Sequence, residues 1–313
     1  MDHGTFDGEK FNELIELGVN RVSLGVQAFQ EQLLRACGRA HGLSEVYEAI
    51  EIVGSCGVEN WSMDLISSLP HQTTEMWEES LRLTVEAQPS PAMCLFTTCK
   101  SNKAPSLVYC KYTPGEFPLP SETDSAKFYR MASSMLSNAG YNHYEISSYS
   151  KNGFECEHNL TYWKNKPFYG FGLGSASYVR GVRYSRPRKL KEYTGYVQNL
   201  EDGAADCSGD RRCYGCCDAL SGTARGLDLK SFREDFGGSL ALSLCKVYKP
   251  YVESGHVVCL DGQRRNLMAN EFSSLLSDEH KMEEVVAFIR LSDPDGFLLS
   301  NELISLAFAA IAP

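Results

Sequence analysis

The chain has 313 residues, with 30 Lys and Arg against 40 Asp and Glu, which gives a formal net charge of −10 at pH 7. That length is ample for about two domains, and the negative charge disfavours nucleic acid or an anionic membrane surface as the main partner, since both would repel it. No apolar run approaches the ~20 residues that span a bilayer, and the first ten residues fit neither a secretory signal nor an Arg-rich transit peptide, so we expect a cytoplasmic protein without a membrane span.

Strand-like and helix-like segments alternate between residues 5 and 150. Short runs of apolar residues predict strands at Val22–Val26, Trp61–Ile66, Ala92–Thr98 and Tyr144–Tyr149. Apolar residues three or four positions apart predict helices before and between these strands, around Phe11, Leu34, Val46, Trp77 and Phe128. This alternation predicts an α/β fold with a parallel sheet. Because no strand is followed by a Gly-rich phosphate turn, part or all of a (β/α) barrel is favoured over a doubly wound sheet.

The pattern becomes mostly helical beyond residue 218. Periodic apolar residues predict one helix over Leu227–Phe236 and a second that starts near Leu240 and ends at Pro250. A short strand is predicted at Val257–Leu260, and further elements at Val285–Leu291 and Leu298–Phe308. The segment is expected to form a small, mostly helical domain with no catalytic group of its own.

Polar residues near the predicted strands are the first candidates for a site. Gln27 directly follows the Val22–Val26 strand, Asp64 lies within the next strand, and Arg39 follows the intervening helix. In barrels the site forms at the carboxyl ends of the strands, and a carboxylate among apolar neighbours needs a partner. Spacing alone favours a plainer interpretation, in which Asp64 caps or pairs locally and Gln27 is solvated in a loop.

Four of the twelve cysteines lie close together in an irregular segment, at positions 207, 213, 216 and 217. Their spacing does not match a zinc ribbon or a known cluster motif. We therefore assign no metal ligands there and expect residues 204–217 to be an irregular, Cys-rich linker.

The segment His158-Asn-Leu-Thr-Tyr-Trp163 brings together one side chain that is able to ligate iron and two large aromatic residues. A neutral imidazole is a good axial ligand for heme iron, and aromatic rings suit the walls of a porphyrin site. Alternatively, His158 bonds a backbone carbonyl while both rings pack in the core. The glycines of Gly170-Phe-Gly-Leu-Gly174 lack the spacing of a dinucleotide fingerprint, so they indicate close approach to a flat ligand or tight packing.

Several of these segments, in one order, resemble a known family. Gly18–Phe29, Gly38–His41 and Asp64–Thr73 are similar to radical-SAM proteins of the oxygen-independent coproporphyrinogen III oxidase family. His143–Tyr149 and above all His158–Trp163 resemble its HemW-type branch, which is regarded as a group of heme chaperones. The match continues through residues 168–178, and residues 222–236 and 296–308 resemble the C-terminal domain of the family.

The resemblance implies a fold and ligands. The fold is a radical-SAM-type barrel over residues 1–203 and the family's C-terminal domain over residues 218–313. Gln27, Arg39 and Asp64 match positions that contact S-adenosylmethionine, and His158 matches the heme ligand. The implied cofactors are S-adenosylmethionine and heme, with a [4Fe-4S] cluster in full-length relatives, and the implied partners are heme and an unidentified heme-acceptor protein.

The chain departs from the family at its start. The family's Cys-x3-Cys-x2-Cys motif occurs nowhere among the twelve cysteines, and Met1–Phe6 resembles the family sequence after the third barrel strand. We therefore expect a partial barrel that misses its first strands, with no cluster ligands and no catalytic residues. Whether such a chain is an enzyme stays open, since its relatives are oxidoreductases, but the chain alone should not cleave S-adenosylmethionine. A full-length parent with a transit peptide would belong in an organelle.

Three functions compete at this point. The leading one is a heme chaperone, which His158–Trp163 favours. The alternative is an oxygen-independent coproporphyrinogen III oxidase in porphyrin biosynthesis. The third is an inactive product with an unstable fold, which the expected loss of strands would explain.

Overall fold

A computed structural model of the chain describes residues 4, 6–39, 41–87, 94–98, 117–164, 166–180, 182–201 and 223–311. In its first half, strands and helices follow one another in the order α1 (Gly8–Glu16), β1 (Val22–Gln27), α2 (Glu31–Ala36), α3 (Leu43–Ser55), β2 (Trp61–Ser67), α4 (Thr74–Glu86), β3 (Cys94–Thr98), α5 (Glu122–Asn138), β4 (Asn142–Glu145) and β5 (Ser148–Ser150).

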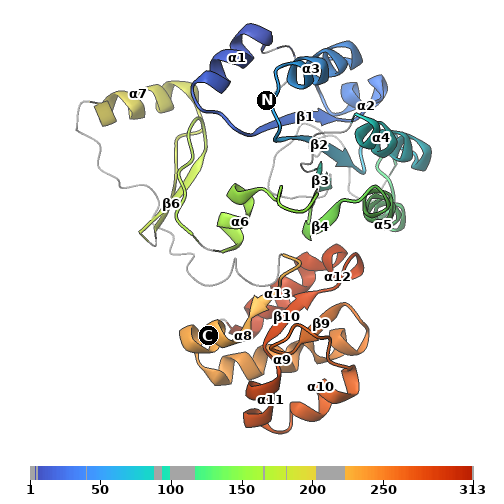
Figure 1. The fold of residues 1–313 in the computed structure, drawn as a ribbon, viewed down its shortest axis with the longest axis vertical. Helices are drawn as coiled ribbons and strands as arrows, with labels where there is room; N and C mark the ends of the chain where they lie inside the picture. Colours follow the sequence, from blue (N-terminus) through green and yellow to red (C-terminus); the bar gives the residue numbers. More distant parts are fainter. Residues whose placement is uncertain are drawn as a thin grey trace.

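These strands form one sheet in the order β1-β2-β3-β5-β4 (Figure 1). β1, β2 and β3 are parallel, as predicted, and each is followed by at least one helix. β5 is antiparallel to both β3 and β4. Among the described strands β1 and β4 are the edges, so this part of the chain is an open α/β sheet.

The single strand predicted at Tyr144–Tyr149 is wrong. The structure divides this segment into β4 and β5, which run antiparallel around a turn and pair Asn142 with Ser150. The turn between the two strands contains neither Gly nor Pro, and larger apolar residues continue to alternate with polar ones through it. The sequence pattern therefore gives no sign of the reversal. The consequence is that β4 carries His143 and Glu145 at the end of the sheet.

The first hydrophobic core fills the space between this sheet and its helices. Leu24 and Val26 of β1 and Met63 and Leu65 of β2 are fully buried there, at every second position of their strands. Trp77 of α4 is also buried, and its indole Nε1 donates a hydrogen bond of 2.8 Å to a backbone carbonyl of α5. The helices therefore cover one face of the sheet and leave the other face for polar side chains.

Two helices and a hairpin follow the sheet. They are α6 (Glu157–Trp163), β6 (Ala176–Val179), β7 (Val182–Ser185) and α7 (Leu190–Glu201), with β6 and β7 paired antiparallel. The predicted Cys-rich linker at residues 204–217 lies outside the described residues.

The C-terminal part is mostly helical, as predicted, around a second core. Its elements are β8 (Leu227–Asp228), α8 (Leu229–Phe236), α9 (Gly238–Glu253), β9 (Val257–Leu260), α10 (Ala269–Leu275), α11 (Glu279–Val285), β10 (Phe288–Leu291), α12 (Asp295–Leu298) and α13 (Ser300–Ile311). Three antiparallel strands in the order β8-β10-β9 pack among these helices. The domain boundaries at 203 and 218 stay predictions.

The predicted end of a helix at Pro250 is wrong, because α9 continues to Glu253. Proline lacks the N–H that would bond the carbonyl four residues earlier, which normally ends a helix. Here Tyr248 and Val252 are buried on either side of it, so packing against the core holds the last turn in place.

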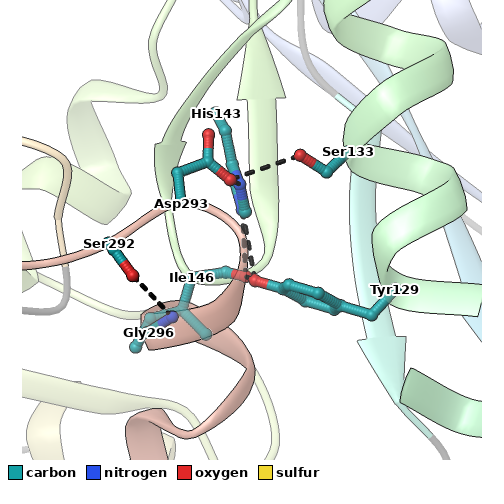
Figure 2. A network of polar contacts seen from close by, with 7 residues as sticks. All are labelled: Tyr129, Ser133, His143, Ile146, Ser292, Asp293 and Gly296. Carbon is teal, nitrogen blue, oxygen red and sulfur yellow. Dashed lines mark hydrogen bonds and ion pairs between the residues drawn. The ribbon is translucent and has the colours of Figure 1, made fainter. Parts of the chain in front are cut away.

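A polar network joins the sheet to the C-terminal part (Figure 2). His143 of β4 has a fully buried side chain, and its Nδ1 lies 2.6 Å from a carboxylate oxygen of Asp293, just before α12. The same oxygen accepts a hydrogen bond of 3.2 Å from Ser133 of α5, and the ring of His143 stacks on that of Tyr149. The network fixes the position of the C-terminal part beside β4, where Figure 1 also shows α6.

Candidate functional site

The face of the sheet that the helices leave uncovered is polar. Because side chains alternate along a strand, Ser23 of β1 and Ser62 and Asp64 of β2 point away from the helix-packed residues. The hydroxyl of Ser23 donates a hydrogen bond of 2.8 Å to Asp64. The hydroxyl of Ser62 is fully buried and has no hydrogen-bond partner. A carboxylate that accepts hydrogen bonds and a hydroxyl without a partner lie on one face. A polar ligand bound there would form hydrogen bonds with both groups.

Gln27 lies at the carboxyl end of β1 in a strained conformation. Its φ is 69°, its side chain is largely buried, and it pairs with Leu65, the residue after Asp64. Ser68 and His71, just after β2, also have positive φ values, of 64° each. Such conformations cost about 1–3 kcal/mol in non-glycine residues and concentrate at binding sites. The ends of two adjacent strands therefore share a strained backbone where the sequence predicted a site.

Burial raises the pKa of Asp64, and the hydrogen bond from Ser23 opposes this shift. The positive charges of Arg21 and Arg39 lower the same pKa, so both guanidinium groups lie within electrostatic reach of the carboxylate. Gln27 thus pairs with the residue next to Asp64, and the positive charge of Arg39 acts on the carboxylate of Asp64. The partner that the structure gives Asp64 is Ser23, which lies 41 positions earlier in the chain.

We predict that Asp64→Asn raises the stability of the chain at neutral pH. The raised pKa means that the folded state binds this proton more tightly than the unfolded state, so stability falls as the pH rises through the raised pKa. Asparagine removes that cost, and we expect a gain on the order of 1 kcal/mol at pH 7 that shrinks near pH 4. Urea unfolding at the two pH values measures it.

The matched control is Asp261→Asn, because a backbone hydrogen bond from Arg265 lowers the pKa of Asp261. Its effect should have the opposite sign, a loss of stability at pH 7. A wild-type chain that is more stable than Asp64→Asn at pH 7 would contradict the prediction.

The His158–Trp163 motif forms α6, and its residues face two directions. Asn159 and Trp163, four positions apart, point to Glu145 of β4. The side-chain amide of Asn159 donates a hydrogen bond of 3.0 Å to Glu145, and the indole N–H of Trp163 bonds its other carboxylate oxygen. Ser148 also donates to Glu145, which is buried. This carboxylate therefore attaches α6 to the sheet.

The other pair of the motif, His158 and Tyr162, lies about 100° away around the helix. The exposed imidazole of His158 forms a hydrogen bond of 2.6 Å through Nε2 with the hydroxyl of Tyr162. The ring of Phe168 contacts both, with centroids 5.8 Å and 4.2 Å away. Burial raises the pKa of Tyr162, which keeps its hydroxyl protonated. The structure thus presents one imidazole at the surface beside two aromatic rings.

The glycine-rich loop serves tight packing in part. A Cβ on Gly170 would lie 2.2 Å from the backbone oxygen of Ala176, so no larger residue fits. Gly172 and Gly174 have positive φ values, which a turn requires. Arg186 donates a hydrogen bond to the carbonyl of Gly170, so its guanidinium holds the loop to the hairpin. Phe171, between Gly170 and Gly172, is 82% exposed.

Sequence reasoning missed the role of Glu145. The signal was present, because a carboxylate among apolar strand residues is the feature that singled out Asp64. What the sequence lacked was the partner, since Asn159 and Trp163 lie 14 and 18 positions after Glu145, beyond the reversal between β4 and β5.

No metal centre emerges from the described residues. No group of three His, Cys, Asp or Glu side chains among them could hold a metal ion. The sequence also contains no Cys-x3-Cys-x2-Cys, so the residues present do not fit an iron–sulfur cluster, and none is assigned to one. In the same part of the chain, no helix has both the length and the apolar character needed to cross a membrane.

The chain is similar to known proteins of one family. Residues 2–84 match the model of the radical SAM superfamily. The heme chaperone HemW of Synechocystis sp. is 34% identical, over 99% of this chain and 74% of that protein. HemW of Lactococcus lactis is 36% identical over 61% of this chain, and HemW of Bacillus subtilis 35% over 60%. The alignment spans about half the length of these last two relatives, 49% in each case.

One solved structure shares the fold. Coproporphyrinogen III oxidase (HemN) of Escherichia coli, a radical SAM enzyme, superposes with a TM-score of 0.70 over 98% of this chain and 68% of that one. The sequence identity is 16%, so this likeness concerns the fold alone. It confirms the radical-SAM-type α/β architecture.

Proposed function

Because this chain belongs to the HemW family of heme chaperones, we propose that it binds heme as a cargo and passes it to an acceptor protein. The observation that carries the proposal is the exposed His158, which lies beside the rings of Tyr162 and Phe168. A neutral imidazole supplies an axial bond to iron, and the flat rings supply contacts to the porphyrin.

The hydrogen bond between His158 and Tyr162 bears on how heme would bind. Nε2 of His158 is occupied by the hydroxyl of Tyr162, so iron ligation through Nε2 requires that this hydroxyl moves aside. On ligation, Nε2 of His158 exchanges the hydroxyl of Tyr162 for the iron. The released hydroxyl can then form a hydrogen bond with a propionate or with water. A site that must break one hydrogen bond on loading and can re-form it on release suits a carrier that gives up its cargo.

We assign Gln27, Arg39 and Asp64 to S-adenosylmethionine. The donor set suits that ligand, since a carboxylate accepts hydrogen bonds from ribose hydroxyls or an amino group, and a guanidinium grips a carboxylate. The strained backbone at Gln27 and the unsatisfied hydroxyl of Ser62 support a ligand at this edge. When bound near an iron–sulfur cluster, this cofactor supplies radical chemistry, and the described residues offer no ligands for such a cluster.

The alternative, a coproporphyrinogen III oxidase, rests on the shared fold with HemN. A fold supports many chemistries, so the residues of the site decide between the two. The His158–Trp163 motif favours the chaperone. The acceptor protein and the cytoplasmic location stay predictions.

Heme titration followed in the Soret region tests the proposal. We expect a saturable band with one heme per chain and a spectrum typical of a nitrogen ligand. Heme bound in this way should pass to apomyoglobin when the two are mixed. Iron-free protoporphyrin IX is the control, because it keeps the ring and the propionates but has no axial position, and it should bind more weakly.

A non-saturable heme signal, or equal binding of heme and iron-free porphyrin, would argue against a histidine-ligated cargo. Anaerobic consumption of coproporphyrinogen III by this chain would support the oxidase instead.

A further inference from the structure

A second ligand site, beyond the proposed function, lies where α6 meets the C-terminal sheet. A pocket of about 340 Å³ opens there between Trp163 of α6, the residue Lys164 that follows this helix, and the segments that hold Arg225, Arg264 and Phe288. This volume falls at the small end of sites that take organic ligands. It suits a ligand of one or two rings rather than a porphyrin.

The charge of this pocket is positive. Lys164, Arg225 and Arg264 line it, against one carboxylate, that of Asp228. Asp228 already accepts hydrogen bonds from the backbone N–H groups of Lys230 and Ser231, where it caps α8. Within the described ranges none of the three cations forms an ion pair, so their charge is available to an anion.

Arg264 is held in place for such a contact. Its guanidinium lies 4.1 Å from the centroid of the Phe288 ring, and one of its nitrogens donates to the backbone oxygen of Arg225 at 3.1 Å. Its backbone has a φ of 61°, a strained value at the edge of a pocket. A stacked guanidinium keeps its remaining N–H groups in one plane, the geometry that carboxylates and phosphates match.

The pocket is separate from the candidate heme ligand. Leu160, Trp163 and Lys164 line it from one side of α6, at positions three and four residues apart. His158 and Tyr162 lie on a different face of the same helix, since about 100° separates successive residues. A ligand in the pocket and a ligand on His158 would therefore contact different faces of α6.

We propose that this pocket binds a flat organic anion, with a carboxylate or phosphate held by Arg264, Arg225 and Lys164 and a ring system placed between Trp163 and Phe288. Apolar walls with a few converging polar groups are the usual composition of a small-molecule site. The positive charges select for an anionic ligand, and the aromatic rings select for a planar one.

Isothermal titration of the full chain with 1-naphthoate, 1-naphthyl phosphate and 1-naphthamide tests the proposal. The amide keeps the rings but has no charge, so we expect it to bind at least about tenfold more weakly than the better of the two anions. The anion that binds more tightly identifies the acidic group. Equal affinity for all three probes would overturn the proposal.

Arg264→Gln should weaken binding of the tighter-binding anion by roughly tenfold and leave binding of 1-naphthamide unchanged. Lys164→Gln should also weaken binding of that anion. Arg265→Gln is the matched control, because Arg265 is the next residue, is exposed, and pairs with Asp261 outside the pocket. Equal effects of Arg264→Gln and Arg265→Gln would count against the site.

Heme titration of Arg264→Gln separates this inference from the proposed function. We expect an unchanged Soret band and no displacement of heme by naphthoate. Displacement would show that the pocket is part of the heme site and would overturn the inference of a second ligand, while heme binding itself would stand.

Discussion

His158→Ala is expected to weaken heme binding by more than about tenfold and to shift the Soret band. The imidazole is the side chain that the exposed face of α6 offers to iron, and alanine removes the axial bond while the rings of Tyr162 and Phe168 remain. Because His158 is exposed and only bonded to Tyr162, the loss should leave the stability of the chain almost unchanged. Heme titration beside urea unfolding measures both effects.

Two variants serve as controls for this result. Tyr162→Phe keeps the ring but removes the hydroxyl that occupies Nε2, so heme affinity should be equal or higher with the same spectrum. Cys156→Ser removes the buried thiol that lies two residues before His158, at the start of α6, and should leave the spectrum as it is. An unchanged spectrum in His158→Ala would place the iron ligand elsewhere and refute this role of the motif.

Among the substitutions considered, Glu145→Ala should cause the largest loss in the free energy of unfolding. The buried carboxylate accepts hydrogen bonds from Ser148, Asn159 and Trp163, and alanine leaves these donors without an acceptor in a half-buried position. Each buried donor that loses its acceptor costs about 1–3 kcal/mol, so we expect a loss of about 3 kcal/mol or more. Since α6 is attached to the sheet through this residue, heme affinity should fall as well, although Glu145 does not touch the candidate ligand.

Urea unfolding measures the loss, and Glu157→Ala is the matched control. Glu157 is an exposed glutamate in the first turn of the same helix, so its removal should change stability by only a few tenths of a kcal/mol. Glu145→Gln keeps one acceptor oxygen and should lie between the two. Equal unfolding midpoints for Glu145→Ala and Glu157→Ala would show that α6 is held by apolar contacts alone.

The sequence pattern predicted much of the fold because local periodicity reflects burial. The strands at Val22–Gln27, Trp61–Ser67 and Cys94–Thr98 appear where apolar runs indicated them. The two errors, at Tyr144–Tyr149 and at Pro250, have one cause. In both places packing against distant residues overrides the local signal: a reversal of the chain in the first and a continued helix in the second.

The candidate site was predictable to a lesser degree. The strained conformation of Gln27 and the raised pKa of Asp64 lie where the sequence pointed, at the ends and inner face of adjacent strands. Their role towards S-adenosylmethionine stays a prediction, as does that of His158 towards heme. The partners of these residues could not be read, because hydrogen bonds such as that from Ser23 to Asp64 span 41 positions.

By itself the sequence determined the alternation of strands and helices, the family and the residues worth testing, since composition, period and motifs are properties of neighbouring positions. Only the tertiary structure decided what each residue of the motif does. It separated Asn159 and Trp163, which hold α6 to Glu145, from His158, which faces outward. It also placed Lys164 beside Arg264, one hundred positions later. Such pairings depend on how segments distant in the chain pack together, and no local pattern contains that information.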